Sequence, residues 1–146
     1  MGDSGSDRFA LRVLQYEFPG ITTPGAYDSN WLVIEGRVES ERGDWTFVDP
    51  CLLTRELESL ISWLRALATP LSSEIGFTEP LLRFTIPDPG EWVTQLTLRA
   101  EALPKSLFTN EMQWGEGITL SLMSTRSQRD WFADSLEADL KRFPRR

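Results

Sequence analysis

Carboxylates are the main candidates for acid–base chemistry in this sequence, because it contains no histidine and a single cysteine, Cys51. The missing histidine excludes Ser-His-Asp and Cys-His catalytic units and Cys/His zinc sites. Glu35 and Glu39 share one face of an expected strand, and Glu101 ends another, so a pair of acids could cleave a glycosidic bond or hold a divalent metal. No Asp-x-Asp or Glu-x-x-His motif marks such a pair, and charges on a strand face are normally solvated.

A second group of residues suits protein recognition better than catalysis. A tryptophan beside an acid near a turn is a suitable anchor for a basic protein surface, because the indole gives contact area and the carboxylate gives complementary charge. The sequence predicts a partner-binding set of this kind at Asp44, Trp45, Glu91, Trp92, Glu111, Trp114 and Glu116. The alternative is that these tryptophans cap the edges of the core, since tryptophan is highly buried on average.

The charge of the chain restricts its partners. The 146 residues carry 22 acids against 15 bases, a net charge of −7. Four of the bases lie in residues 141–146, so the rest of the chain has 22 acids against 11 bases. An acidic body repels nucleic acid and attracts basic proteins, although many proteins are acidic for solubility alone. We therefore expect a protein partner and no direct nucleic-acid binding.

Composition indicates a folded chain with no targeting segment. Hydrophobic residues make up 40% and aromatic residues 11% of the sequence, enough for a core. We expect a disordered tail at 1–7 and a single α+β domain at 8–146. No apolar run approaches the roughly 18 residues of a membrane span, and the acidic N-terminus is unlike a secretory signal. A cytoplasmic location, no membrane contact and no cofactor or metal are expected, with Cys51 as a small buried hydrophobe.

Hydrophobic periodicity predicts seven strands and two helices in the order βββαββββα. The expected strands are 9–18, 31–39, 45–48, 74–77, 81–86, 92–101 and 117–123, and the expected helices are 54–68 and 128–143. Short loops containing Gly43 and Gly90 join neighbouring strands as hairpins. We therefore expect a mostly antiparallel sheet of about six to seven strands, with two amphipathic helices packed on it.

Local signals predict where the helices begin. Thr54 is a candidate N-cap of the first helix. Asp49 as N-cap with Pro50 at the first helical position is an alternative start, and in either case this pair is expected to end the preceding strand. Ser127 and Asp130 are expected to form a capping box at the start of the second helix.

Several segments carry a family resemblance. They are YDSNWLVI at 27–34, WTFVDPCLLT at 45–54 with Glu56 and Trp63-Leu64 after it, FTEP at 77–80, and the closing Phe143-Pro144-Arg145. Over roughly residues 11–146 the chain resembles the WapI family of bacterial immunity proteins, and residues 49–54 are the most specific part. The resemblance implies a cytoplasmic inhibitor of the toxic C-terminal domain of an exported, wall-associated protein. Such toxins are commonly RNA-cleaving nucleases.

The sequence favours a non-catalytic protein-binding domain, an immunity protein that neutralises a basic, nuclease-type toxin. An acidic body could plug the basic cleft of such a nuclease and gain association rate by electrostatic steering. One alternative is a protein–protein adaptor or regulatory domain with another partner. The other is a carboxylate-dependent hydrolase, which acids clustered in a deep pocket with perturbed ionisation would favour.

Overall fold

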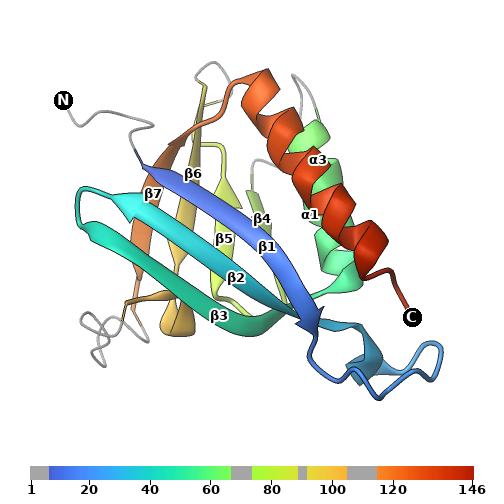
Figure 1. The fold of residues 1–146 in the computed structure, drawn as a ribbon. Coiled ribbons are helices and arrows are strands. Elements are labelled where there is room, and N and C mark those ends of the chain that lie inside the picture. The colour runs from blue at the N-terminus through green and yellow to red at the C-terminus, as the bar shows by residue number, and fades with distance from the viewer. Residues whose placement is uncertain (1–6, 67–73, 89–91, 105–114) are drawn as a thin grey trace.

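The computed structural model describes residues 7–66, 74–88, 92–104 and 115–146, and the strands within them form two antiparallel sheets (Figure 1). The first sheet has the order β1-β2-β3, from Arg8–Tyr16, Trp31–Ser40 and Gly43–Leu53. The second has the order β4-β5-β6-β7, from Glu74–Gly76, Leu82–Thr85, Val93–Leu98 and Ile118–Met123. The expected α+β class, antiparallel pairing and element order are confirmed, with the strands divided between two sheets.

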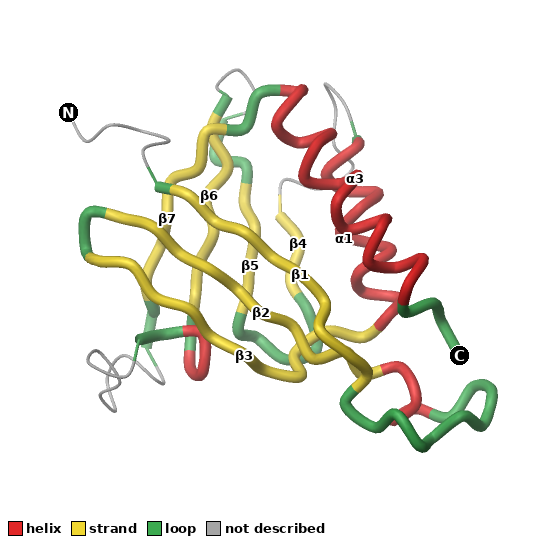
Figure 2. Tube along the Cα trace, viewed as in Figure 1, coloured by secondary structure: helices red, strands yellow, loops and turns green. Residues whose placement is uncertain are grey.

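Two helices close one side of the paired sheets (Figure 2). Helix α1 spans Thr54–Arg65 and helix α3 spans Arg126–Arg142, and α3 contacts both α1 and β1. The backbone N–H of Val13 in β1 donates to Asp139 Oδ2 of α3 at 2.9 Å, which fastens the helix to this strand. Short 3-10 turns, η1 at Tyr27–Asn30 and η2 at Ala100–Ala102, precede β2 and follow β6.

The core lies between the sheets, and Phe84 is at its centre. Phe84 in β5 is 1% exposed, and its ring contacts rings from three other elements. The ring centroids lie 6.4 Å from Phe9 of β1, 6.2 Å from Trp63 of α1 and 6.4 Å from Phe132 of α3. Aromatic contacts at this separation add to the free energy of area burial, so one side chain joins both sheets and both helices.

Strand β3 runs through the residues that were expected to end it. The pairing of β2 with β3 passes from Ile34 opposite Asp49 to Leu32 opposite Leu52, so β3 holds one extra residue at this point. β3 is an edge strand of its sheet, and edge strands and bulges are where a proline without an N–H is tolerated. The expectation that Asp49-Pro50 ends the strand or begins the helix is wrong.

Helix α1 starts at Thr54, and Leu53 is its N-cap. The Thr54 hydroxyl donates to Asn30 Oδ1 at 2.9 Å instead of capping its own helix. Glu56 supplies the cap, because its Oε1 accepts the Leu53 N–H at 3.0 Å. The N-cap prediction for Thr54 is therefore wrong by one residue.

Helix α3 also starts earlier than expected. Its N-cap is Thr125, whose hydroxyl accepts from the Gln128 N–H at 3.3 Å while Gln128 Oε1 accepts the Thr125 N–H at 2.9 Å. This reciprocal pair is a capping box, so the box predicted at Ser127 and Asp130 is wrong. Asp130 lies 3.7 Å from Arg126 as an i,i+4 ion pair.

Gly36 of β2 makes room for a buried ring. Its cross-strand partner is Phe47 of β3, which is 5% exposed. An ideal Cβ at Gly36 would lie 2.2 Å from Phe47 Cζ and 2.3 Å from Phe47 Cε1. Such a separation is far below van der Waals contact, so any side chain at this position displaces the ring from the core.

Gly36→Ala is expected to lower the free energy of unfolding by about 1–3 kcal/mol, the usual cost of overpacking a core. Urea denaturation followed by tryptophan fluorescence measures it. Gly76→Ala in β4 is the matched control, since a Cβ there meets nothing within 4 Å. Equal losses in the two variants would contradict the packing argument.

Candidate functional site

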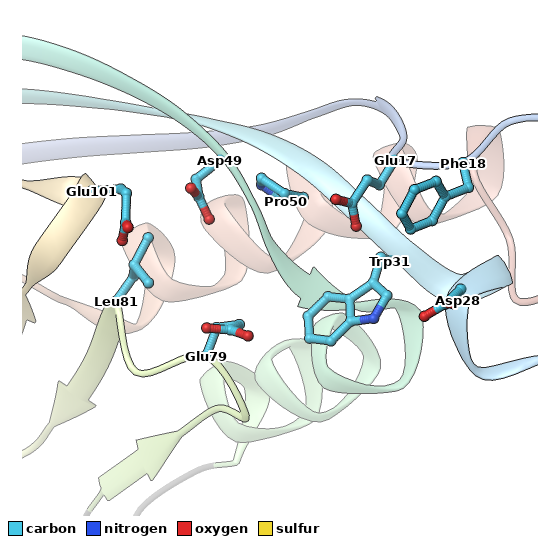
Figure 3. Close-up of a pocket in the computed structure, with 9 residues that line it drawn as sticks. All are labelled: Glu17, Phe18, Asp28, Trp31, Asp49, Pro50, Glu79, Leu81 and Glu101. Atoms are coloured by element: carbon cyan, nitrogen blue, oxygen red, sulfur yellow. The ribbon is translucent and has the colours of Figure 1, made fainter.

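An open cleft of about 380 Å³ lies beside the ends of β1 and β3, next to η1 (Figure 3). Five of its nine lining residues are acids and none is basic. They are Glu17, Phe18, Asp28, Trp31, Asp49, Pro50, Glu79, Leu81 and Glu101. The acids come from four separate regions of the chain, so the fold and not local sequence brings them together.

Two bulges bend the first sheet beside the cleft. β1 carries an extra residue at Leu14, next to Val33 of β2. β3 carries an extra residue at Pro50–Cys51, across from the same Val33. A bulge increases the local twist and redirects the strand, so the ends of β1 and β3 both turn at this level.

Asp49 faces the interior side of the sheet because of its register. It pairs with Ile34, which is fully buried, and residues paired across an antiparallel ladder present their side chains on the same face. Figure 3 shows the Asp49 carboxylate directed into the cleft, toward Glu79 and Leu81. A core-facing position within β3 therefore carries an acid.

The buried carboxylate of Glu56 holds the opposite side of the cleft in place. Glu56 of α1 is 9% exposed, and besides capping its helix it accepts the Thr78 N–H through Oε2 at 2.7 Å. This bond anchors the segment 77–80, which carries Glu79. The segment is held further by the Leu81 N–H, which donates to the Glu79 carbonyl at 2.9 Å.

A hydrogen bond from Trp45 holds the far end of the cleft, where Glu101 lies. Glu101 lies in η2, and the Trp45 indole Nε1–H donates to the carbonyl of Ala102 at 2.9 Å. Because Trp45 lies in β3, this bond attaches η2 to the edge of the first sheet. Trp45 is partly buried and packs against the core, which agrees with the alternative expectation of a core-edge tryptophan.

Two acids of the cleft, Asp49 and Glu17, have a raised pKa. The pKa of Asp49 is raised to about 6, chiefly by burial and then by the charges of Glu101, Glu79 and Glu17. Burial also raises the pKa of Glu17, with smaller effects from Asp28 and Glu79. Mutual repulsion of this kind is relieved when a cation enters, because an opposite charge favours the ionised form.

The lining of the cleft suits an organic cation. Carboxylates supply charge and hydrogen-bond acceptors, and the Trp31 indole adds a π face of the kind that attracts a guanidinium or ammonium group. Phe18, 40% exposed at the rim, offers apolar contact to the stem of a long basic side chain. In the described parts of the chain, no group of three or more His, Cys, Asp or Glu residues is arranged to hold a metal ion.

The partner-binding set expected from the sequence lies outside the cleft wherever it is described. Asp44 is exposed in β3, Glu116 is exposed before β7, and Trp92 is 56% exposed before β6. Trp45 is partly buried, as above. The remaining three positions, Glu91, Glu111 and Trp114, lie outside the described residues. An exposed tryptophan that was not expected, Trp131, is 79% exposed on α3.

Of the three acids considered for catalysis, Glu101 lines the cleft, while Glu35 and Glu39 are on a solvated surface. Glu39 is exposed and Glu35 is partly exposed on the outer face of β2, and Glu35 Oε1 pairs with Arg12 Nε at 2.9 Å. Cys51 is 1% exposed, and burial raises the pKa of its thiol. A buried thiol with a raised pKa is a poor nucleophile, so the expected packing role of Cys51 is confirmed.

The segments that carry the family resemblance meet at the cleft. Asp28 and Trp31 belong to the first segment, Asp49 and Pro50 to the second, and Glu79 to the third. Sequence reasoning did not group these acids, because nothing in their spacing marks them as neighbours. The resemblance was the one signal that singled out the segments of Asp28, Asp49 and Glu79.

The chain is an α+β protein whose described residues form an acidic cleft. The chain belongs to the WapI-like immunity protein family, whose model matches residues 1–144. No curated protein and no solved structure matches it. Membership in an immunity family suggests a toxin-neutralising role. Among the described helices, none has the length and apolar content to cross a membrane.

The raised pKa of Asp49 predicts a pH-dependent stability effect. The folded protein holds this proton more tightly than the unfolded chain, so ionisation costs stability as the pH rises from the ordinary value of 3.8 through about 6. Asp49→Asn should therefore raise the free energy of unfolding at pH 7.5 by about 1 kcal/mol, after allowance for solvent screening. The gain should disappear at pH 4.

Urea denaturation at the two pH values measures this effect. Glu116→Gln is the control, because it removes the same charge at an exposed position outside the cleft. If Asp49→Asn were neutral at pH 7.5, or stabilising to the same degree at pH 4, burial and the neighbouring acids would not be disfavouring the ionised Asp49 carboxylate.

Proposed function

We propose that this protein is a non-catalytic immunity protein that neutralises a cognate toxin by taking a basic part of it into the acidic cleft. Family membership supports the toxin-neutralising role. The observation that carries the binding site is a cleft with five acids and no lining base. The partner is then a basic toxin domain of the nuclease type, met in the cytoplasm, and residues 8–146 act as one domain.

The physics of the cleft fits such a partner. A nuclease binds a polyanion with lysines and arginines, and an acidic surface that covers those groups competes directly with the nucleic acid. The net charge of −7 also steers a basic partner during diffusion. Inside the cleft, an arginine of the toxin would meet carboxylates in a partly desolvated site, where charge-assisted hydrogen bonds are strongest.

The test uses the toxin domain encoded beside the immunity gene, with inhibition of its activity and association kinetics as readouts. We expect the association rate constant to fall by about 10-fold or more between 20 mM and 500 mM salt. The triple variant Asp49→Asn, Glu79→Gln, Glu101→Gln should raise the dissociation constant at least about 10-fold, since it removes three charges that face the ligand.

A second triple variant tests whether binding depends on the acids of the cleft or on the overall negative charge of the protein. Glu39→Gln, Asp44→Asn, Glu116→Gln removes the same charge from exposed positions outside the cleft, two of them in the set expected from the sequence. We expect it to keep nearly the full affinity. If it weakened binding as much as the cleft variant, the partner would be recognised by the overall field. If the toxin were not inhibited at all, the immunity role would fail.

Catalysis by a carboxylate-dependent hydrolase is the second candidate. The observation that favours it is Asp49, whose pKa of about 6 lies near the operating range of a general acid or base. The same cleft would then take a substrate and not a protein side chain. Hydrolysis of glycoside or phosphate-ester probes that is abolished by Asp49→Asn, with the exposed triple variant still active, would establish this function in place of binding.

A further inference from the structure

The side chain of Arg146 is bonded to the segment that forms one wall of the cleft. Its Nε and Nη2 donate to the Ser29 carbonyl at 2.9 and 2.7 Å. Nη2 also donates to the Phe18 carbonyl at 3.0 Å, and Nη1 donates to the Pro19 carbonyl at 3.1 Å. The guanidinium carbon lies 3.7 Å from the centroid of the Tyr16 ring, a cation–π contact.

The backbone of Arg146 strengthens the same attachment. Its N–H donates to Asn30 Oδ1 at 2.9 Å, and its carbonyl accepts from Asn30 Nδ2 at 3.0 Å and from the Gly25 N–H at 3.3 Å. Asn30 Oδ1 also accepts from the Thr54 hydroxyl of α1. The end of η1, the start of α1 and Arg146 are therefore held in one hydrogen-bond network.

The Glu17 N–H donates to the Trp31 carbonyl at 2.9 Å, which ties the start of the 17–30 segment to β2, while the bonds within the segment are local. The N–H groups of Ile21, Ala26 and Ser29 each donate to a carbonyl three residues earlier. Turns of this kind fix short stretches but do not fix where the whole segment lies. A planar guanidinium with five donors can bond several carbonyls at once, which a lysine ammonium cannot do in the same geometry. Arg146 is thus well suited to hold residues far apart in this segment.

Arg146 acts on the cleft without entering it. It is not among the lining residues, and its guanidinium is bonded to carbonyls, which leaves the carboxylates of the cleft free for a ligand. The residues it holds, Phe18 and Ser29, are next to Glu17 and Asp28, which line one wall. We propose that Arg146 is a positioning residue, whose carbonyl-bonded side chain sets the place of Glu17 and Asp28 relative to Asp49 and Glu79. This inference rests on the proposed binding function.

The test compares Arg146→Ala with Arg145→Ala in the full chain. Arg145 is exposed, and both variants remove one positive charge. A gain in net negative charge alone should leave the binding of a hexaarginine peptide unchanged or slightly tighter. Loss of positioning should instead raise the dissociation constant of the peptide in Arg146→Ala by about 5- to 10-fold, the size expected for losing several charge-assisted bonds. Arg146→Ala is therefore expected to weaken peptide binding, while Arg145→Ala leaves it unchanged or slightly tighter.

Amide hydrogen exchange supplies a second readout that needs no ligand. Arg146→Ala should exchange about 10-fold faster at the amides of Ile21, Gly25 and Ser29, while protection in the strands of the core stays unchanged. Arg145→Ala should match the wild type. Arg146→Lys, which keeps the charge without the planar fork, should recover only part of both effects.

The outcomes separate the two proposals. If the peptide binds the wild type through Asp49 and Glu79, but Arg146→Ala matches Arg145→Ala in affinity and exchange, the positioning role is overturned. Exchange that rises equally throughout the core would also overturn it, because Arg146 would then support the whole fold. If the wild type binds the peptide no better than the cleft triple variant does, the proposed binding function fails, and the exchange measurement alone decides the positioning role.

Discussion

The bend opposite Val33 is the constraint on which the site depends. Both neighbours of β2 carry an extra residue at this level, so the sheet cannot continue as a regular ladder there. Residues on both sides of the two bulges belong to the core. Asp49 lies just before the bulge of β3 and Glu17 follows the end of β1, so both acids lie next to the irregular part of the sheet. Core and cleft residues are thus parts of the same strands.

This arrangement explains how the fold tolerates five acids in one cleft. Mutual repulsion and partial burial both raise the free energy of the ionised carboxylates, as the raised pKa of Asp49 records. The buried core of the two sheets and helices offsets this cost. Glu56 shows the contrasting case, a buried carboxylate that receives two backbone N–H groups. Sites that bind cations often carry such uncompensated charge, because the ligand relieves it.

Sequence periodicity predicted the fold well, since core positions alternate in the strands and recur every three or four residues in the helices. It failed at Asp49-Pro50, where the local breaker signal was overridden because β3 is an edge strand with a bulge, which is a property of the tertiary fold. At the start of α3, two overlapping capping patterns were present. The one that formed is Thr125 with Gln128.

Hydrophobic periodicity could not predict the cleft, for a different reason. Its acids are scattered between Glu17 and Glu101, and only the pairing of the strands brings them together. Tryptophans next to acids, such as Trp45 beside Asp44, are visible in the sequence, but adjacency along a strand sends neighbouring side chains to opposite faces. Trp45 therefore faces the core while Asp44 faces solvent.

The contact between Arg146 and Ser29 spans 117 residues of sequence. Contacts of such separation carry a large loop-closure entropy and form late on a folding pathway. During synthesis on the ribosome, β1, β2 and β3 can pair while the remainder of the chain is still being made, but this wall of the cleft lacks its anchor until residue 146 has left the exit tunnel and α3 has docked. On the ribosome, this wall of the cleft would thus be completed after the strands of the first sheet.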